Sequence, residues 1–224
     1  IVNHFGVECK EIKKSEDDQD HAEWGNRCIF VIGSELVGNP YMEHMIYEEA
    51  SCDNLHVWGL GAGSELNLRK RVTPRIYKKI HIHAVRGPIS QKIIGLGPDL
   101  PMGDPAFLMP QVLPINRNPS ANITYVPHHD TLSSLKLKVN NVLNDIEANN
   151  YIDVRFPEHN FQKVLNCLVD SKFVLTSTLH TAILCISYNV PWAPLQLDGE
   201  VIGGIHHPLK WFDVIKWLNI PDEK

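Results

Sequence analysis

One arginine follows an apolar run, in a position that suits the binding of an anion. Residues 80–85 form the run, Arg86 comes directly after it, and Gly87 and Pro88 then lead into a helix-like stretch. A guanidinium group is planar, carries five N–H donors, and can hold a carboxylate or phosphate through two parallel hydrogen bonds. Gly87 leaves space where such a ligand would approach. We interpret Arg86 as an anion-binding residue, with a structural ion pair to Asp104 as the alternative.

A second polar group lies between an apolar run and a predicted helix. Ser177 and Thr178 follow residues 173–175, and His180 falls in the first turn of a helix predicted over residues 179–188. Backbone N–H groups at a helix N-terminus bind phosphate, and the helix dipole adds about 0.3–1 kcal/mol for an anion. His180 could therefore be a cationic phosphate ligand or a general acid. Alternatively, Ser177 or Thr178 caps the helix and His180 packs against the sheet.

Two further titratable side chains occupy turns near the ends of predicted strands. Asp104 lies in a Gly-Asp-Pro turn, where the proline restricts the backbone that follows. It could orient a sugar hydroxyl or Arg86, or have a purely structural role. His128 follows the predicted strand at residues 123–126, and of the adjacent histidines at 128 and 129 only one can face a ligand. We expect that one to be His128.

Small residues follow the first two apolar runs and predict loops that a ligand can approach closely. Gly33 and Ser34 come after residues 28–32, and Gly59 and Gly61 follow the second run, residues 55–58. Residues 59–64 resemble a dinucleotide-binding fingerprint only loosely, because serine stands where the last glycine or alanine belongs. We therefore interpret these four residues as substrate-binding and do not expect a nicotinamide cofactor.

Histidine and cysteine patterns do not predict a metal site. The histidine pairs at positions 81/83 and 206/207 have no third ligand at a suitable spacing. The five cysteines are odd in number, widely spread, and form no CxxC pair, which is typical of reduced cytosolic thiols. We expect neither a metal nor a cofactor.

Composition narrows the range of partners. The net charge of −5 offers no general attraction to nucleic acid, so an anionic substrate needs local cations. No apolar run approaches the roughly 20 residues needed to span a bilayer. We expect a cytoplasmic protein that does not cross the membrane and could associate with its inner face, and that could form a homo-oligomer. Because the sequence starts at Ile1 without Met, we also expect a native N-terminal segment to be missing.

The elements that must position these residues alternate between apolar runs and helix-like stretches, as in a doubly wound α/β fold. A Pro- and Asn-rich stretch at residues 110–122 interrupts this alternation and predicts a linker. The sequence thus predicts two Rossmann-like domains that face each other across a cleft, residues 1–115 and residues 116–224, the second ending in a helix at about residues 209–218. Ligands in such folds bind at the carboxyl ends of the strands.

Taken in order, the motifs resemble those of the polysaccharide pyruvyl transferase family. The motifs are Val31-Ile32-Gly33-Ser34, Val57-Trp58-Gly59-x-Gly61, Ala84-Val85-Arg86-Gly87-Pro88-x-Ser90, Gly103-Asp104-Pro105-Ala106, Val126-Pro127-His128, and Ser177-Thr178-Leu179-His180 before Tyr188-x-Val190-Pro191. The likeness extends from about Phe30 to Pro191.

This resemblance implies a fold like that of GT-B glycosyltransferases and transfer of a pyruvyl group from phosphoenolpyruvate to two hydroxyls of a sugar, forming a ketal. The acceptor would be a saccharide or a lipid-linked saccharide. Arg86 matches the family arginine that holds phosphoenolpyruvate, and His180 matches the histidine of the Leu-His motif. Many members have arginine where this chain has Thr178, and the usual Asn-x-Gly-Asp-like loop is not found before Phe30. A nucleotide-sugar glycosyltransferase or a non-catalytic sugar-binding module are the alternatives.

Overall fold

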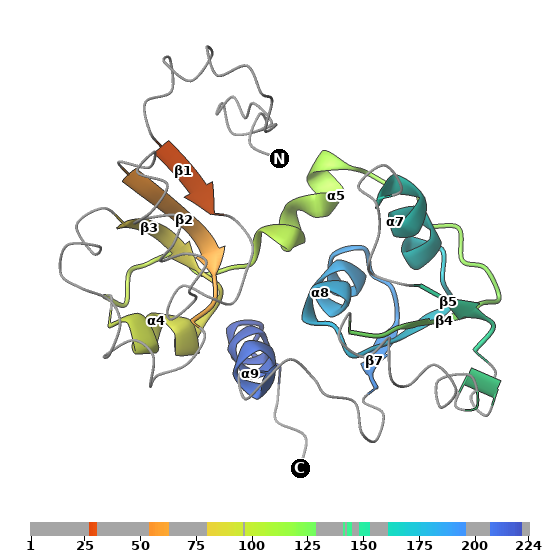
Figure 1. Ribbon diagram of the computed structural model, residues 1–224. Helices are drawn as coiled ribbons and strands as arrows, with labels where there is room; N and C mark the ends of the chain where they lie inside the picture. The colour runs from red at the N-terminus through yellow and green to blue at the C-terminus, as the bar shows by residue number, and fades with distance from the viewer. Residues whose placement is uncertain are drawn as a thin grey trace, which may run out of the picture. The chain divides into compact units, whose positions relative to one another are not determined.

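Two compact units make up the chain. The computed structural model describes residues 27–30, 54–62, 80–95, 97–128, 141, 143–144, 148–152, 161–195 and 207–220. One unit, the 106–205 unit, comprises Ala106–Ile205, and the other, the discontinuous unit, comprises Val2–Pro105 together with His206–Lys224. Both contain parallel strands and helices (Figure 1). The predicted α/β class with parallel strands is therefore confirmed.

The discontinuous unit contains a three-stranded parallel sheet in the order β1-β2-β3. Its strands are β1 (Arg27–Phe30), β2 (Asn54–Leu60) and β3 (Ile80–Val85). Val57 and Val85 are completely buried, whereas His81 and His83 on β3 are exposed.

Two helices complete the described part of this unit. Helix α4 (Pro88–Ile94) begins with a proline, which suits the first helical position, and ends at Gly95 in the left-handed conformation. Helix α9 (His207–Trp217) packs against α4 although more than a hundred residues separate the two. The sequence assigned this last helix to a domain of residues 116–224, whereas its contacts place it with the discontinuous unit.

The 106–205 unit contains a four-stranded parallel sheet in the order β5-β4-β6-β7. The strands are β4 (Ile123–Val126), β5 (Asn150–Tyr151), β6 (Phe173–Thr176) and β7 (Trp192–Pro194). The chain passes from β4 outward to β5 and later, from β6, outward to β7 in the opposite direction. The strand order therefore reverses between β4 and β6, which are hydrogen-bonded neighbours.

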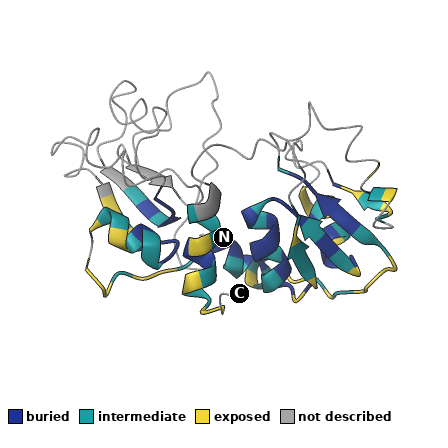
Figure 2. Ribbon diagram, turned by 90° about the horizontal axis from the view of Figure 1, so that it is seen from below, coloured by how far each residue is buried: buried dark blue, intermediate teal, exposed yellow. Residues whose placement is uncertain are grey.

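Helices cover this sheet through apolar residues at helical spacing. They are α5 (Met109–Val112), which follows the short η3 (Pro105–Leu108), and then α7 (Phe161–Val169) and α8 (Leu179–Ser187). In α7 the buried residues are Leu165, Leu168 and Val169, three and four positions apart. Together with strand residues such as Val126 and Val174 they form the core of the unit, visible as dark blue in Figure 2.

The Pro- and Asn-rich stretch lies within the 106–205 unit and is fixed to the end of α7. Arg117 donates from Nε to the Val169 carbonyl at 3.1 Å and from Nη2 to the Ser171 carbonyl at 2.9 Å. The backbone N–H of Asn118 donates to Asp170 Oδ1 at 2.9 Å. Residues 110–112 of the stretch are helical, as the end of α5, and in the rest of it these hydrogen bonds take the place of regular structure.

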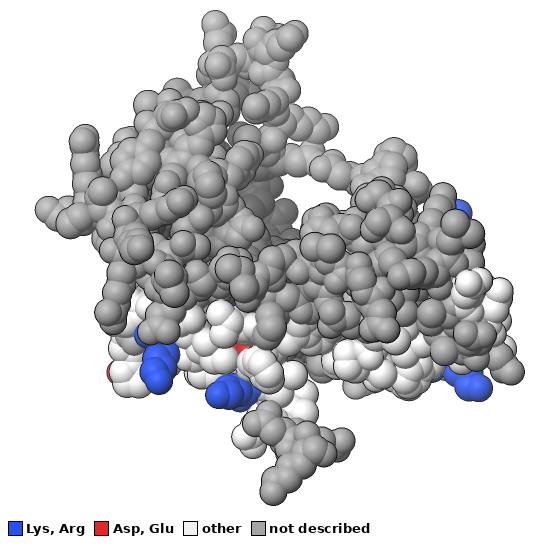
Figure 3. Space-filling view, turned by 60° about the horizontal axis from the view of Figure 1, so that its bottom comes forward, with Lys and Arg blue, Asp and Glu red and all other residues white. Residues whose placement is uncertain are grey.

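Among the helices in the described part of the chain, none is both long enough and apolar enough to cross a membrane. On the face shown in Figure 3, the Lys and Arg side chains of described residues lie at separate places and form no continuous basic patch.

Candidate functional site

The residue Arg86 lies where three segments of the discontinuous unit meet. Its backbone N–H donates to the Leu60 carbonyl at the end of β2, at 3.1 Å. On the other side of β3, the N–H of Gly103 donates to the Val85 carbonyl at 2.8 Å. The carboxyl ends of β2 and β3 and the turn containing Asp104 are therefore adjacent, at the edge of a parallel sheet where ligands bind.

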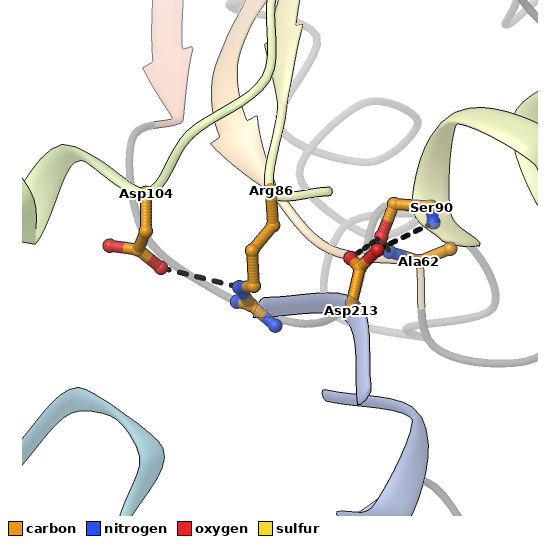
Figure 4. A network of polar contacts seen from close by, with 5 residues as sticks. All are labelled: Ala62, Arg86, Ser90, Asp104 and Asp213. Carbon is orange, nitrogen blue, oxygen red and sulfur yellow. Dashed lines mark hydrogen bonds and ion pairs between the residues drawn. The ribbon is translucent and has the colours of Figure 1, made fainter. Parts of the chain in front are cut away.

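Arg86 and Asp104 form a buried ion pair. The Nε atom of Arg86 is 3.2 Å from Asp104 Oδ2, and both side chains are completely buried (Figure 4). This contact is the structural pair that the sequence offered as the alternative for Arg86. The pair is neutral in total and places a guanidinium and a carboxylate side by side. Desolvation of both charges makes their mutual contact necessary for stability.

Two of the predicted glycines accommodate protein groups at this edge. A Cβ atom on Gly61 would lie 2.5 Å from Nη1 and 2.9 Å from Cζ of Arg86, so only glycine lets the backbone pass against the guanidinium. Gly59 lies within β2 and not in a loop after it as predicted; its φ is +77°, and a side chain there would meet Pro105 and the Gly103 carbonyl. Both glycines thus bring the end of β2 close to the Arg86–Asp104 pair. Their contact with a substrate stays a prediction.

A carboxylate that the sequence did not single out joins the same region. Asp213, in α9, accepts hydrogen bonds at Oδ1 from the backbone N–H groups of Ile89 at 2.8 Å and Ser90 at 3.1 Å. The Ser90 hydroxyl donates to Asp213 Oδ2 and accepts from the Ala62 N–H at 2.8 Å. In the sequence, Asp213 was visible only as a residue within the helix predicted at about residues 209–218.

The 106–205 unit carries the second cluster at the reversal point of its sheet. The backbone N–H of His128, two residues after β4, donates to the Ser177 hydroxyl at the end of β6, at 2.8 Å. The Thr176 hydroxyl donates to the Val126 carbonyl at 2.8 Å and accepts from the Thr178 N–H at 3.0 Å. The crevice outside the strand ends at such a reversal is the usual ligand site of open α/β sheets.

Helix α8 begins directly after Ser177 and Thr178. Thr178 is the N-cap residue, but its side chain makes no capping hydrogen bond to the first turn and donates to the Thr181 hydroxyl. His180 lies in the first turn and is half-buried between the buried residues Leu179 and Thr181. The helix is nine residues long and apolar on its inner side. Its N-terminus therefore places backbone N–H groups, two hydroxyls and an imidazole in one short segment.

The structure thus groups most of the predicted residues into two clusters, each within its own unit. Arg86, Asp104, Gly59, Gly61 and Gly87 belong to the discontinuous unit, and His128, Ser177, Thr178 and His180 belong to the 106–205 unit. Gly33 and Ser34 lie outside the described residues.

The histidines of the second and third strands are neighbours on the sheet. The ring of His56 stacks with those of His81 and His83, and its Nδ1 atom is 2.9 Å from His83 Nε2. Across residues with a described placement, no group of three His, Cys, Asp or Glu side chains is arranged to hold a metal ion.

Comparisons with known proteins support the family that the sequence resembles. The polysaccharide pyruvyl transferase family matches residues 5–199. The chain is also similar to the succinoglycan biosynthesis protein ExoV of Rhizobium meliloti (strain 1021), with 24% identity over 146 residues, which cover 64% of this chain and 42% of ExoV. The chain thus spans less than half of that relative's length, and no solved structure matches it significantly. Since the family match covers most of the sequence, the chain belongs to the polysaccharide pyruvyl transferase family.

Proposed function

We propose that the protein transfers a pyruvyl group from phosphoenolpyruvate to two hydroxyls of one sugar in a polysaccharide or its precursor. The observation that carries this proposal is the buried Arg86–Asp104 pair at the carboxyl end of β3, within the residues that match the family. A guanidinium in that place suits the carboxylate or phosphate of the donor. Consistent with its name, the relative ExoV acts in succinoglycan biosynthesis.

The reaction requires a proton, a charge-stabilising group and an activated hydroxyl. The methylene carbon of phosphoenolpyruvate gains a proton, and the two sugar oxygens form bonds to the central carbon while its bond to the phosphate oxygen breaks. The two sugar hydroxyls each lose a proton. One of these protons balances the proton that the methylene carbon gains, and the other leaves with the released phosphate. The products are a cyclic pyruvate ketal and inorganic phosphate.

Each cluster supplies part of this chemistry in the proposal. Arg86 binds the carboxylate or phosphate of the donor. Asp104, already held beside Arg86, accepts a hydrogen bond from the acceptor hydroxyl, and His128 helps to orient the sugar. His180 and the first turn of α8 bind phosphate and provide a proton. Two Rossmann-like domains arranged as in GT-B enzymes are part of the same proposal, and the parallel sheets of both units support it.

The test measures phosphate release from phosphoenolpyruvate with a saccharide acceptor, and ketal formation by mass spectrometry. We expect Arg86→Ala and His180→Ala each to reduce the rate, for Arg86 by about 10²–10³ as for a lost charge-stabilising donor. The matched control is Arg117→Lys, because Arg117 hydrogen-bonds only carbonyls in the contacts described above. Circular dichroism of each variant excludes unfolding as the cause.

Other results would point to another activity. Wild-type rates in folded Arg86→Ala and His180→Ala would refute the assigned roles. Stabilisation against heat by uridine diphosphate, with none by phosphoenolpyruvate, would indicate a nucleotide-sugar glycosyltransferase. Saccharide binding without phosphate release from any donor would indicate a sugar-binding module. If both residues act on one donor, the double variant should lose much less than the product of the two single losses.

A further inference from the structure

We infer that Asp213, on the last helix, is a positioning residue for Arg86. The inference rests on the proposed function of Arg86. Asp213 lies 14 residues beyond the segment that matches the family, which ends at residue 199, so the resemblance assigns it no role. Its side chain nevertheless reaches the turn that follows Arg86 (Figure 4).

The carboxylate of Asp213 takes the place of a local cap for α4. Gly87 precedes the helix and has no side chain to accept the first N–H groups, and Asp213 accepts those of Ile89 and Ser90 instead. Asp213 is 3% exposed and Ser90 is 2% exposed. Hydrogen bonds from N–H groups to a charged acceptor are stronger than those between neutral groups, and burial protects them from water. The start of α4 is therefore fixed to α9.

The turn at Gly87 also packs closely against α9. A Cβ atom on Gly87 would lie 2.3 Å from the backbone oxygen of Asp213 and 2.5 Å from its Oδ1. Because Gly87 directly follows Arg86, this close approach fixes the backbone from which the guanidinium extends. Only glycine permits that approach.

A second connection runs from Asp213 to the face of the guanidinium. Asp213 binds the Ser90 hydroxyl, which accepts from the Ala62 N–H. Ala62 follows Gly61, whose backbone lies against Nη1 and Cζ of Arg86. Asp213 thus holds both the backbone that carries Arg86 and the backbone against which its side chain rests.

The other side of the ion pair also touches α9. Gly103, immediately before Asp104, lies beside the Trp217 ring, with a Cβ atom there 3.3 Å from the ring. Asp213 and Trp217 are four residues apart and so share one face of the helix. This face therefore contacts the turns of both members of the Arg86–Asp104 pair.

The experiment compares two variants that cut these connections differently. Asp213→Asn keeps an oxygen for the N–H groups of α4 but removes the charge, and Ser90→Ala keeps the cap but cuts the connection to Ala62. The matched control is Asp170→Asn, which removes the charge of a carboxylate that accepts a backbone N–H in the other unit. Each is measured for kcat and KM with phosphoenolpyruvate, in wild-type and Arg86→Ala backgrounds. Phenylglyoxal modification of Arg86, followed by peptide mass spectrometry, is measured without any substrate.

We expect Asp213→Asn and Ser90→Ala to lower kcat/KM on the order of 10-fold or more, as small displacements of catalytic groups do. In the Arg86→Ala background the same changes should alter the rate less than about twofold, because the residue they position is gone. Both variants should also speed the modification of Arg86, and Asp170→Asn should not. A cap that serves only stability would lower the rate equally in both backgrounds.

Two results would overturn the inference. One is unchanged modification of Arg86 in folded Asp213→Asn and Ser90→Ala, and the other is an equal loss of rate with and without Arg86. If the wild type releases no phosphate from phosphoenolpyruvate while Arg86 modification still accelerates in both variants, the proposed function fails and the positioning role stands.

Discussion

Replacing Gly61 by alanine tests whether the guanidinium of Arg86 is held rigidly. The new Cβ atom would lie 2.5 Å from Nη1, whereas ordinary contact begins at 3.4 Å, so one group must move by about 0.9 Å (3.4 − 2.5). The end of a surface arginine would simply swing away. Here the guanidinium is buried and joined to Asp104 at 3.2 Å, and a displacement of that size directed away from Asp104 would take the two atoms beyond hydrogen-bond distance.

The expected cost follows from these contacts. Overpacking a buried site typically costs about 1–3 kcal/mol, and a weakened buried ion pair adds to it. We expect Gly61→Ala to lower the free energy of unfolding by about 2–3 kcal/mol, measured by urea denaturation with tryptophan fluorescence. The KM for phosphoenolpyruvate should rise in the same variant.

Gly97→Ala is the matched control. A Cβ atom on Gly97 meets nothing within 4 Å, so the same chemical change should alter the free energy of unfolding by less than about 0.5 kcal/mol. If Gly61→Ala is as stable as Gly97→Ala, the guanidinium moves freely and the reasoning about a fixed pair is wrong.

Three further predictions concern stability and thiol chemistry. Asp104→Ala should lower the free energy of unfolding by about 3–5 kcal/mol in urea denaturation, because it leaves the Arg86 charge buried without its carboxylate. The double variant Arg86→Met/Asp104→Leu should recover most of that loss. A double variant as unstable as Asp104→Ala would contradict this prediction. Thr176→Val should lower the free energy of unfolding by about 1–3 kcal/mol in the same measurement, since it removes the buried hydroxyl that binds the Val126 carbonyl and the Thr178 N–H. A variant as stable as the wild type would show that water or a neighbouring group replaces that hydroxyl. Burial raises the pKa of Cys185 to about 12, although the positive charge of Arg117 acts in the opposite direction. Iodoacetamide at pH 8 should therefore leave Cys185 unmodified until the 106–205 unit unfolds. Modification of Cys185 at the rate of the half-buried Cys167 would refute its burial. Because the unfolded thiol ionises near pH 9 and the native thiol only near 12, this group stabilises the fold below pH 9 and its contribution declines as the pH rises toward 12.

The local pattern was enough to predict several of the strands and the turns that carry chemistry, but it did not predict β7. Residues 55–58 and 173–175 are short apolar runs, and both lie in parallel strands, β2 and β6. Because parallel strands end at the same edge, the sequence also indicated that Arg86 and Asp104 would lie at one site, with a structural ion pair between them only as the alternative, and that His128 and Ser177 would follow strand ends. Those relations depend on short-range periodicity and on general rules of sheet topology.

Long-range partners could not be predicted in the same way. An amphipathic pattern shows that one face of α9 is buried, but not that Asp213 on that face caps a helix 123 residues earlier in the chain. For the same reason the pattern did not show that α9 joins the discontinuous unit. Glycines at positions 61 and 87 indicated a need for space, but only the structure shows that Arg86 and Asp213 fill it.

Because α9 belongs to the discontinuous unit, its position late in the chain constrains the order in which the chain can fold during synthesis. The residues of the 106–205 unit all leave the ribosome before α9 does, so this unit can form its core while the discontinuous unit still lacks α9. Until Asp213 is translated, the N–H groups of Ile89 and Ser90 lack their acceptor. Although domains generally fold N-terminal first during synthesis, the Arg86 turn can be completed only after α9 has been synthesised.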